Sequence, residues 1–280
     1  MNILEILKVI VLGIVEGITE WLPVSSTGHL ILVDEFLKLD ATEDFKEMFD
    51  VVIQLGAILA VIVIYFKKIW PVDRDNNTKR LAWNRDKLVL WGKILIACVP
   101  AAIIGILFDD LIDEIFYNPY VVSVTLIVYG IAFIVIEILN KGKAFKINNL
   151  GELTIRTALI IGVFQVLALI PGTSRSGATI IGAMLIGTDR TVAAEFTFYL
   201  AIPVMLGASL LKLLKFFVGG GVLGGAEIVY LLTGMVVAFA VSVIVIKFLM
   251  SFIKKHDFKV FGIYRIILGI AVMTYFLVAT

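Results

Sequence analysis

Long apolar segments separated by shorter polar stretches dominate this chain. A helix needs about 20 consecutive apolar residues to cross the hydrocarbon core of a bilayer. Six segments have about that length and carry almost no charge, namely 49–66, 88–108, 120–139, 196–217, 227–250 and 260–279. The pattern therefore predicts six transmembrane helices.

Four further apolar segments are too short or too interrupted to cross the membrane alone. They form two pairs, 3–20 with 24–37 and 153–169 with 176–187. The first pair is broken around Pro23 and the second around Pro171. Proline removes a backbone donor and biases the preceding residue away from helix. We expect each pair to be two half-helices that form a re-entrant hairpin, entering and leaving the membrane on one face.

The order of these segments repeats along the chain. Each half contains a hairpin and then three crossings, the first over about 1–140 and the second over about 149–280. The two proline breaks correspond, and at the same spacing Ser26 corresponds to Ser174. An odd number of crossings places the second copy upside down relative to the first. The predicted fold is a single all-α integral membrane domain with two inverted-topology repeats and a binding site at their interface.

Loop charges orient the predicted helices. Cytoplasmic loops of membrane proteins carry an excess of Lys and Arg. The loops at 67–93, 140–156 and 251–259 are rich in these residues, whereas 109–118 and 218–226 carry none. The six-helix count places all three basic loops on the cytoplasmic side and both termini outside. The first hairpin then enters from the outer face and the second from the cytoplasm, so the site opens to the outer face.

Composition excludes several other classes. The chain is 60% hydrophobic and 17% charged, with a mean hydropathy of +1.04 and a net charge of +1. A soluble domain is nearer half apolar and a quarter charged, and a nucleic-acid-binding surface needs a clear basic excess. The single cysteine, Cys98, excludes a disulfide within the chain. Around a predicted turn, Asp189, Arg190 and Glu195 are expected to form a solvated cluster.

Two carboxylates lie at membrane depth in the first hairpin. Glu16 and Glu20 are four residues apart, so both project from one helix face. Ionisable groups inside a membrane are costly and mark functional sites. A divalent cation with oxygen ligands, Mg²⁺ or Ca²⁺, is their natural partner, because it relieves the repulsion between them. The structural alternative is that the pair caps the hairpin or forms an ion pair with Arg175.

A run of hydroxyls begins the second half of this hairpin. Ser25, Ser26 and Thr27 precede His29, which lies one helical turn after Ser26. A helix N-terminus presents free N–H groups and a positive dipole end to an anion such as phosphate. A hydroxyl beside an imidazole is a typical activated nucleophile with its base. The structural alternatives are a helix N-cap and a histidine that only satisfies local hydrogen bonds.

The second hairpin supplies donors and a cation. Thr173, Ser174, Ser176 and the small Gly177 surround Arg175, whose guanidinium binds phosphate bidentately and stays charged. A structural ion pair with a glutamate of the first hairpin is the alternative. The two hairpins together provide carboxylates, hydroxyls, an imidazole and a cationic clamp. This set suits phosphoryl transfer, in which positioning and charge neutralisation dominate.

Three stretches identify a family that the chain resembles. EGITEWLPVSSTGHL at 16–30, PGTSRSGATI at 171–180 and DVVIQLGAILAV at 50–61 resemble the undecaprenyl-diphosphate phosphatase family, also called the bacitracin-resistance family. The resemblance implies hydrolysis of undecaprenyl diphosphate to undecaprenyl phosphate and inorganic phosphate in the bacterial inner membrane. It further implies a divalent-metal requirement, recycling of the lipid carrier for peptidoglycan synthesis, and resistance to bacitracin.

The same resemblance suggests a role for each motif residue. Glu16 and Glu20 correspond to the metal and acid–base carboxylates, Ser26 to the nucleophile, His29 to its partner, and Arg175 to the phosphate clamp. The nucleophile stays open between Ser26, His29 and a metal-bound water. The expected partners are a prenyl diphosphate lipid and membrane lipid, without nucleic acid, and a homodimer is left open. A lipid-phosphate transporter or flippase is the rival function, because inverted repeats with broken helices are typical of transporters.

Overall fold

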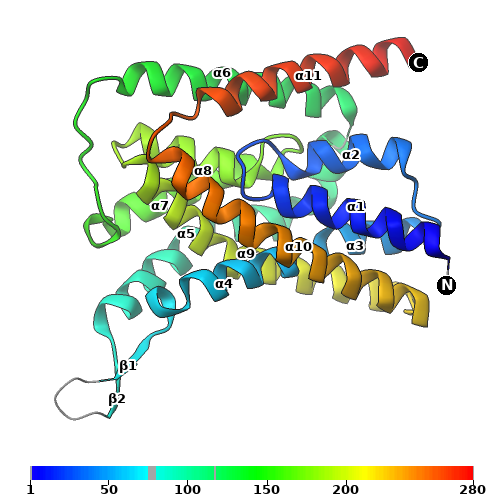
Figure 1. The fold of residues 1–280 in the computed structure, drawn as a ribbon, viewed down its shortest axis with the longest axis horizontal. Coiled ribbons are helices and arrows are strands. Elements are labelled where there is room, and N and C mark those ends of the chain that lie inside the picture. The colour runs from blue at the N-terminus through cyan, green and yellow to red at the C-terminus, as the bar shows by residue number, and fades with distance from the viewer. Residues whose placement is uncertain (1, 75–79, 117, 280) are drawn as a thin grey trace.

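The computed structural model describes residues 2–74, 80–116 and 118–279, and its elements are almost all helical (Figure 1). The helices are α1 (Ile3–Thr19), α2 (Ser26–Phe36), α3 (Glu43–Val52), α4 (Gln54–Ile69), α5 (Arg85–Phe116), α6 (Pro119–Asn140), α7 (Ile155–Val166), α8 (Arg175–Leu185), α9 (Arg190–Val218), α10 (Gly225–Ile253) and α11 (Lys259–Ala279). Short 3-10 turns, η1 (Leu150–Glu152) and η2 (Leu167–Leu169), precede and follow α7.

Six helical stretches in the described part of the chain are long and apolar enough to cross a membrane. They are Glu43–Ile69, Arg85–Phe108, Pro119–Asn140, Arg190–Val218, Gly225–Ile253 and Lys259–Val278. Each overlaps one of the six predicted segments, so this expectation is confirmed. The first is formed by α3 and α4, which join at Ile53. The chain is therefore a multi-pass membrane protein.

The shorter helices form two helix–loop–helix units. In the first, α1 ends at Thr19 and α2 begins at Ser26. In the second, α7 ends at Val166 and α8 begins at Arg175. The breaks coincide with the two proline loops that the sequence indicated, and both proline residues lie outside regular helix.

The structure differs from the sequence expectation in the connections before and after α5. The basic 67–93 loop contains an antiparallel hairpin of β1 (Val72–Arg74) and β2 (Leu81–Trp83), which pairs Asp73 with Ala82. Lys87 of α5 donates to Asp73 at 2.6 Å, which joins the hairpin to α5, and this hydrogen bond lowers the pKa of the Asp73 carboxyl. At its other end, α5 continues to Phe116, where a loop at 109–118 was expected. The helix continues because no glycine or proline interrupts residues 106–118.

The expected solvated cluster was wrong for Arg190, which has a buried partner. Arg190 donates from Nε to Oε1 of Glu137 at 2.8 Å, and Glu137 is only 1% exposed on α6. The same carboxylate accepts from the backbone N–H of Phe258 at 2.9 Å. Glu195 accepts from the buried Tyr199 hydroxyl at 2.5 Å. Glu195 also forms an ion pair at 2.8 Å with Lys68 of α4, whose side chain is exposed. The contacts of Glu137 thus tie α9 to α6 and to the connection before α11.

Close helix pairs form the bundle. Figure 1 shows α6 and α11 side by side, and they cross where Gly130 faces Gly262. A Cβ added at either glycine would lie 2.6 Å from the carbonyl oxygen of the other. The pairs α1 with α10 and α5 with α7 pack closely as well. Small residues allow two helices to approach this closely, and the van der Waals contacts that result stabilise helix pairs inside a membrane.

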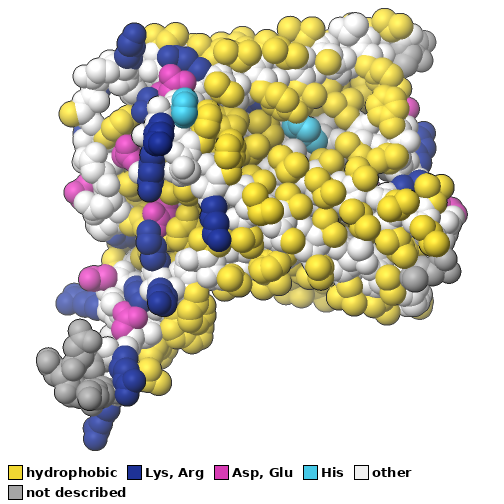
Figure 2. Space-filling view, in the orientation of Figure 1, with side chains coloured by type: hydrophobic (Ala, Val, Ile, Leu, Met, Phe, Trp, Pro, Cys, Tyr) yellow, Lys and Arg dark blue, Asp and Glu magenta, His cyan; other side chains and the backbone are white. Residues whose placement is uncertain are grey.

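Charge separates the two ends of the bundle. Figure 1 shows both chain ends at the end opposite the β1–β2 hairpin. Figure 2 shows most of the visible Lys and Arg side chains gathered toward the β1–β2 end, with a broad hydrophobic surface beside them. The loop asymmetry that the sequence indicated is therefore also an asymmetry in space.

Candidate active site

The two proline loops are held together by one buried cation. Arg265 of α11 donates from Nη1 to the carbonyl of Pro23 at 3.1 Å. Its Nη2 donates to the carbonyls of Gly172 at 2.8 Å and Thr173 at 2.9 Å. Arg265 is 0% exposed and forms no ion pair with any described residue. Sequence reasoning missed it, and the only signal was a charged residue within the apolar 260–279 segment.

Both loops end in the same way. Ser25 and Ser174 are the N-caps of α2 and α8, and they have positive φ angles of 76° and 70°. Their hydroxyl oxygens accept from the backbone N–H of Gly28 and Gly177, both at 3.2 Å. Non-glycine residues rarely adopt this conformation, and such strain is typical of functional sites. Because the two serines share both the φ angle and the cap hydrogen bond, Ser25 and Ser174 are structurally equivalent.

This equivalence corrects one sequence correspondence. The spacing of the prolines matched Ser174 with Ser26, whereas the structure matches Ser174 with Ser25. The second loop has one more residue between its proline and its cap serine. Arg175 is consequently the counterpart of Ser26, because each is the first residue of its helix. The candidate nucleophile and the candidate clamp occupy equivalent positions.

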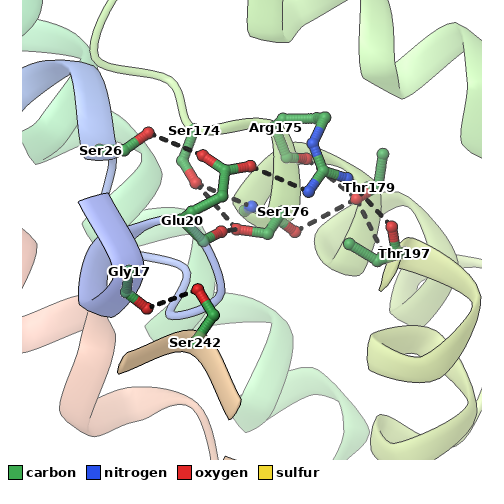
Figure 3. Close-up of polar contacts among 10 residues, drawn as sticks. Gly17, Glu20, Ser26, Ser174, Arg175, Ser176, Thr179, Thr197 and Ser242 are labelled. Atoms are coloured by element: carbon green, nitrogen blue, oxygen red, sulfur yellow. Dashed lines mark hydrogen bonds and ion pairs between the residues drawn. The ribbon is translucent and has the colours of Figure 1, made fainter. Parts of the chain in front are cut away.

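Glu20 lies at the centre of the polar contacts between the units (Figure 3). Its Oε1 accepts from Nη2 of Arg175 at 3.0 Å, and its Oε2 accepts from the Ser26 hydroxyl at 2.9 Å. The Ser176 hydroxyl donates to its backbone carbonyl at 3.3 Å. Glu20 is only 7% exposed. One buried carboxylate thus joins a hydroxyl of the first unit to a guanidinium of the second.

Helix α9 holds the other side of Arg175. Nη1 donates to the carbonyl of Thr197 at 3.0 Å, and the Thr197 and Thr179 hydroxyls lie 2.9 Å apart. Figure 3 shows these contacts on the side of Arg175 away from Ser26. The Nε of Arg175 is buried without a hydrogen-bond partner among the described residues. Thr197 was not predicted, since nothing in the α9 sequence distinguishes it from a structural threonine.

Glu16 is fully buried near this centre. It is 0% exposed, and neither of its carboxylate oxygens has a hydrogen-bond partner in the part of the chain that the structure describes. It interacts electrostatically with Glu20, Asp50 and Arg175. A buried carboxylate without partners costs several kcal/mol, by an order-of-magnitude argument, unless another group compensates. Its unsatisfied oxygens are suited to a cation.

His29 is not paired with Ser26. Its Nδ1 lies 2.6 Å from the Ser25 carbonyl oxygen, and its Nε2 lies 2.6 Å from the hydroxyl of Tyr264. The Ser26 hydroxyl donates to Glu20 instead. The structure thus brings Glu20, Ser26 and Arg175 into one hydrogen-bonded group, with His29 at its edge beside Tyr264. Tyr264 was also missed by sequence reasoning, because one tyrosine in an apolar helix is ordinary.

The remaining predicted phosphate-binding residues surround the two helix starts. Thr27 lies partly exposed in the first turn of α2, whereas Thr173 and Ser176 are 0% exposed. Ser174 and Ser176 have their hydroxyl oxygens 3.2 Å apart. A Cβ added at Gly177 would lie 3.3 Å from Nη1 of Arg265, so a side chain would crowd the loops there.

A divalent cation fits these residues only with help from a ligand. Among residues 2–74, 80–116 and 118–279, no group of three or more His, Cys, Asp or Glu side chains is arranged to hold a metal. Glu16 offers two unsatisfied oxygens, and Glu20 lies one helical turn away. Mg²⁺ is commonly bound by one or two carboxylates together with substrate phosphates. The donor set is therefore compatible with a metal completed by a phosphate group.

Comparison with known proteins identifies the family of this chain. The sequence model of the family described as "Bacitracin resistance protein BacA" matches residues 9–271. An "Undecaprenyl-diphosphatase" of Lachnoclostridium phytofermentans is 61% identical over 279 residues, covering 100% of both chains. An "Undecaprenyl-diphosphatase" of Enterococcus faecalis is 60% identical over 270 residues, covering 96% of this chain and 97% of the relative. The chain therefore belongs to the bacitracin resistance protein BacA family.

Proposed function

We propose that this protein hydrolyses undecaprenyl diphosphate to undecaprenyl phosphate and inorganic phosphate. The activity recycles the lipid carrier for cell-wall synthesis and confers resistance to bacitracin. The observation that carries the proposal is the buried group in which Glu20 accepts from both Ser26 and Arg175. Full-length relatives at about 60% identity that are named undecaprenyl-diphosphatase support the choice of substrate.

The geometry favours Ser26 as the nucleophile and Glu20 as its base. The Ser26 oxygen attacks the terminal phosphorus, its proton passes to Glu20, and the bond to the bridging oxygen breaks to release undecaprenyl phosphate. Water then hydrolyses the phosphoserine to release inorganic phosphate. Arg175 neutralises the transferred group, and the N-termini of α2 and α8 present N–H groups to it. The sequence suggested His29 as the base, but Ser26 is hydrogen-bonded to Glu20.

Glu16 and Glu20 are the residues that would hold a divalent cation, Mg²⁺ or Ca²⁺. The cation would supply positive charge that neutralises the phosphate oxygens. The unsatisfied oxygens of Glu16 support this assignment. Phosphate binding falls to Arg175 and to the hydroxyls and backbone groups of Ser25, Thr27, Thr173, Ser174, Ser176 and Gly177.

We also infer that the chain is built of two inverted repeats whose short units are re-entrant. The equivalent caps at Ser25 and Ser174 support this. Pairing of α1 with α10 and of α7 with α5 has the same symmetry. With the basic end toward the cytoplasm, the site opens to the outer face of the bacterial inner membrane. A homodimer stays a prediction.

Phosphate release by the purified protein in detergent tests the proposed function. With a prenyl diphosphate, the wild type should release phosphate, while Ser26→Ala and Arg175→Ala should lose nearly all activity. A rapid quench followed by mapping of the modified residue should find phosphate on Ser26. Near-normal turnover by Ser26→Ala would exclude the serine mechanism and favour His29 or water. Lipid binding without any phosphate release by the wild type would favour a transporter or flippase.

A further inference from the structure

His29 has a hydrogen-bond partner on each ring nitrogen. Nδ1 lies 2.6 Å from the Ser25 carbonyl oxygen, and Nε2 lies 2.6 Å from the Tyr264 hydroxyl. A carbonyl oxygen only accepts, so Nδ1 carries a proton in both charge states of the ring. The proton that His29 gains and loses is therefore on Nε2, beside Tyr264.

The Tyr264 hydroxyl is suited to both charge states. A phenol both donates and accepts. It donates to the lone pair of Nε2 when the imidazole is neutral, and it accepts from Nε2–H when the ring is charged. Only the O–H bond turns between the two states. The two ring planes are 4° apart with centroids separated by 5.6 Å, and the 2.6 Å contact suits a hydrogen bond in either direction.

Helix α11 places Tyr264 rigidly beside the site. The next residue, Arg265, is 0% exposed and donates to carbonyls of both proline loops. Tyr264 is 44% exposed, and His29 is partly exposed on α2. Arg265 is the charged side chain that acts electrostatically on His29. Two consecutive residues of α11 thus contact the site: Arg265 binds the two proline loops, and Tyr264 contacts the imidazole of His29.

The Ser25 carbonyl is equally well placed. Ser25 is held at a φ of 76° as the cap of α2, and its carbonyl also accepts from the backbone N–H of His29 at 3.3 Å. The imidazole is therefore fixed on one side by a strained cap and on the other by Tyr264. Two fixed partners leave the ring a single orientation.

We propose that Tyr264 is a positioning residue, whose hydroxyl takes the hydrogen-bonding position of Nε2 of His29 and so fixes the imidazole and its exchangeable proton at the edge of the site. The proposal rests on the proposed phosphatase function. It keeps the exchangeable proton of His29 apart from that of Ser26, which goes to Glu20. Tyr264 acts only through His29 and takes no part in bond breaking.

Tyr264→Phe tests this role, because it keeps the ring and removes only the hydroxyl. With a prenyl diphosphate in detergent, we expect kcat to fall about 10-fold with KM little changed, and the pH profile of kcat to move by about half a pH unit or more. Tyr275→Phe is the matched control on the same helix, since Tyr275 contacts Phe36 and Phe276 instead of His29. It should behave as the wild type does.

A second measurement reads the contact directly. The chain has two histidines, so ¹⁵N-histidine spectra contain two sets of ring signals, and His256→Gln assigns them. In the wild type, neutral His29 should carry its proton on Nδ1, which is the less common tautomer. Tyr264→Phe should shift the Nε2 signal and the titration midpoint of His29, whereas Tyr275→Phe should change neither.

Each outcome decides the proposal. Unchanged kcat and an unchanged pH profile in Tyr264→Phe would overturn it. A loss of activity with a lower melting temperature and unchanged His29 signals would also overturn it, because Tyr264 would then be structural. If the wild type released no phosphate, the proposed function would fail, and the His29 spectra would still show whether Tyr264 positions the ring.

Discussion

The α1–α2 and α7–α8 units begin their second helices with the same backbone but carry different chemistry. Ser25 and Ser174 cap these helices with nearly equal φ angles and nearly equal hydrogen bonds. The next residue is a hydroxyl, Ser26, in the first unit and a guanidinium, Arg175, in the second. The first unit also carries Glu20, to which both of these side chains bond.

The difference between the units extends to their buried polar residues. Glu16 lies nine residues before its cap serine, and Gln165 lies nine residues before Ser174. Both side chains are almost fully buried, and neither has a hydrogen-bond partner among the described residues. A charged carboxylate in one unit thus corresponds to a neutral amide in the other. Similar backbones provide two helix N-termini. The side chains differ, so the buried carboxylates Glu16 and Glu20 lie in the α1–α2 unit and the guanidinium of Arg175 lies in the α7–α8 unit.

The largest expected effect is that of breaking the link between the units at Glu20. Glu20→Gln should lower phosphate release about 10³-fold, because an amide cannot take the Ser26 proton or balance the charge of Arg175. Initial rates in detergent measure this, with Glu35→Gln on the same unit as the control. A variant that retained more than a tenth of the wild-type rate would show that Glu20 is not the base.

The next largest effect concerns Arg265, whose guanidinium binds both proline loops. Arg265→Met should lower the free energy of unfolding by about 3 kcal/mol, because three loop carbonyls lose a charged donor. Thermal unfolding in detergent measures the change. Arg156→Met, at the exposed start of α7, should leave stability nearly unchanged. Equal effects of the two substitutions would mean that the loops hold their positions without Arg265.

A smaller effect tests the equivalence of the two caps. Ser25→Ala and Ser174→Ala should each cost about 1 kcal/mol, because each removes the acceptor for one first-turn N–H. Hydrogen exchange at the amides of Gly28 and Gly177 reads each cap separately. Glycine at either position should cost less than alanine, because it adopts a positive φ without strain. Clearly unequal costs of the two alanine variants would contradict the equivalence.

The smallest expected effect concerns Gln165, the buried amide that corresponds to Glu16. Gln165→Met should raise the free energy of unfolding by about 1 kcal/mol, because it removes a buried amide without partners and keeps its volume. Thr188→Val is a matched control, since the Thr188 hydroxyl is also buried without a partner among the described residues. Both variants should melt at higher temperature than the wild type. A lower melting temperature for Gln165→Met alone would show that the amide has a structural partner.

Much of the architecture followed from hydrophobic length and proline position. The six crossings appear where runs of about 20 apolar residues predicted them, and the two broken pairs separate at Pro23 and Pro171. These features are local, because bilayer thickness and the missing proline N–H act on a single segment. The helical extension of α5 to Phe116 was missed, since apolar length marks where a crossing ends and not where a helix ends.

For the site as well, the sequence predicted one part and the tertiary structure decided the other. The residue types of the motifs predicted a phosphate site with Glu20, Ser26, His29 and Arg175, but not which of them touch. Only the tertiary structure decided that Ser26 bonds to Glu20 and that His29 bonds to Tyr264.

The sequence by itself determined the membrane crossings, the two breaks and the chemistry available at them. The tertiary structure alone decided the match of Ser174 with Ser25 and the use of Tyr264 and Arg265 from a distant helix. The physical reason is that a hydrogen bond depends on atomic positions to within a fraction of an ångström. Those positions depend on how each helix is rotated and where it crosses its neighbours, and contacts such as that between Gly130 and Gly262 set this only in the folded bundle.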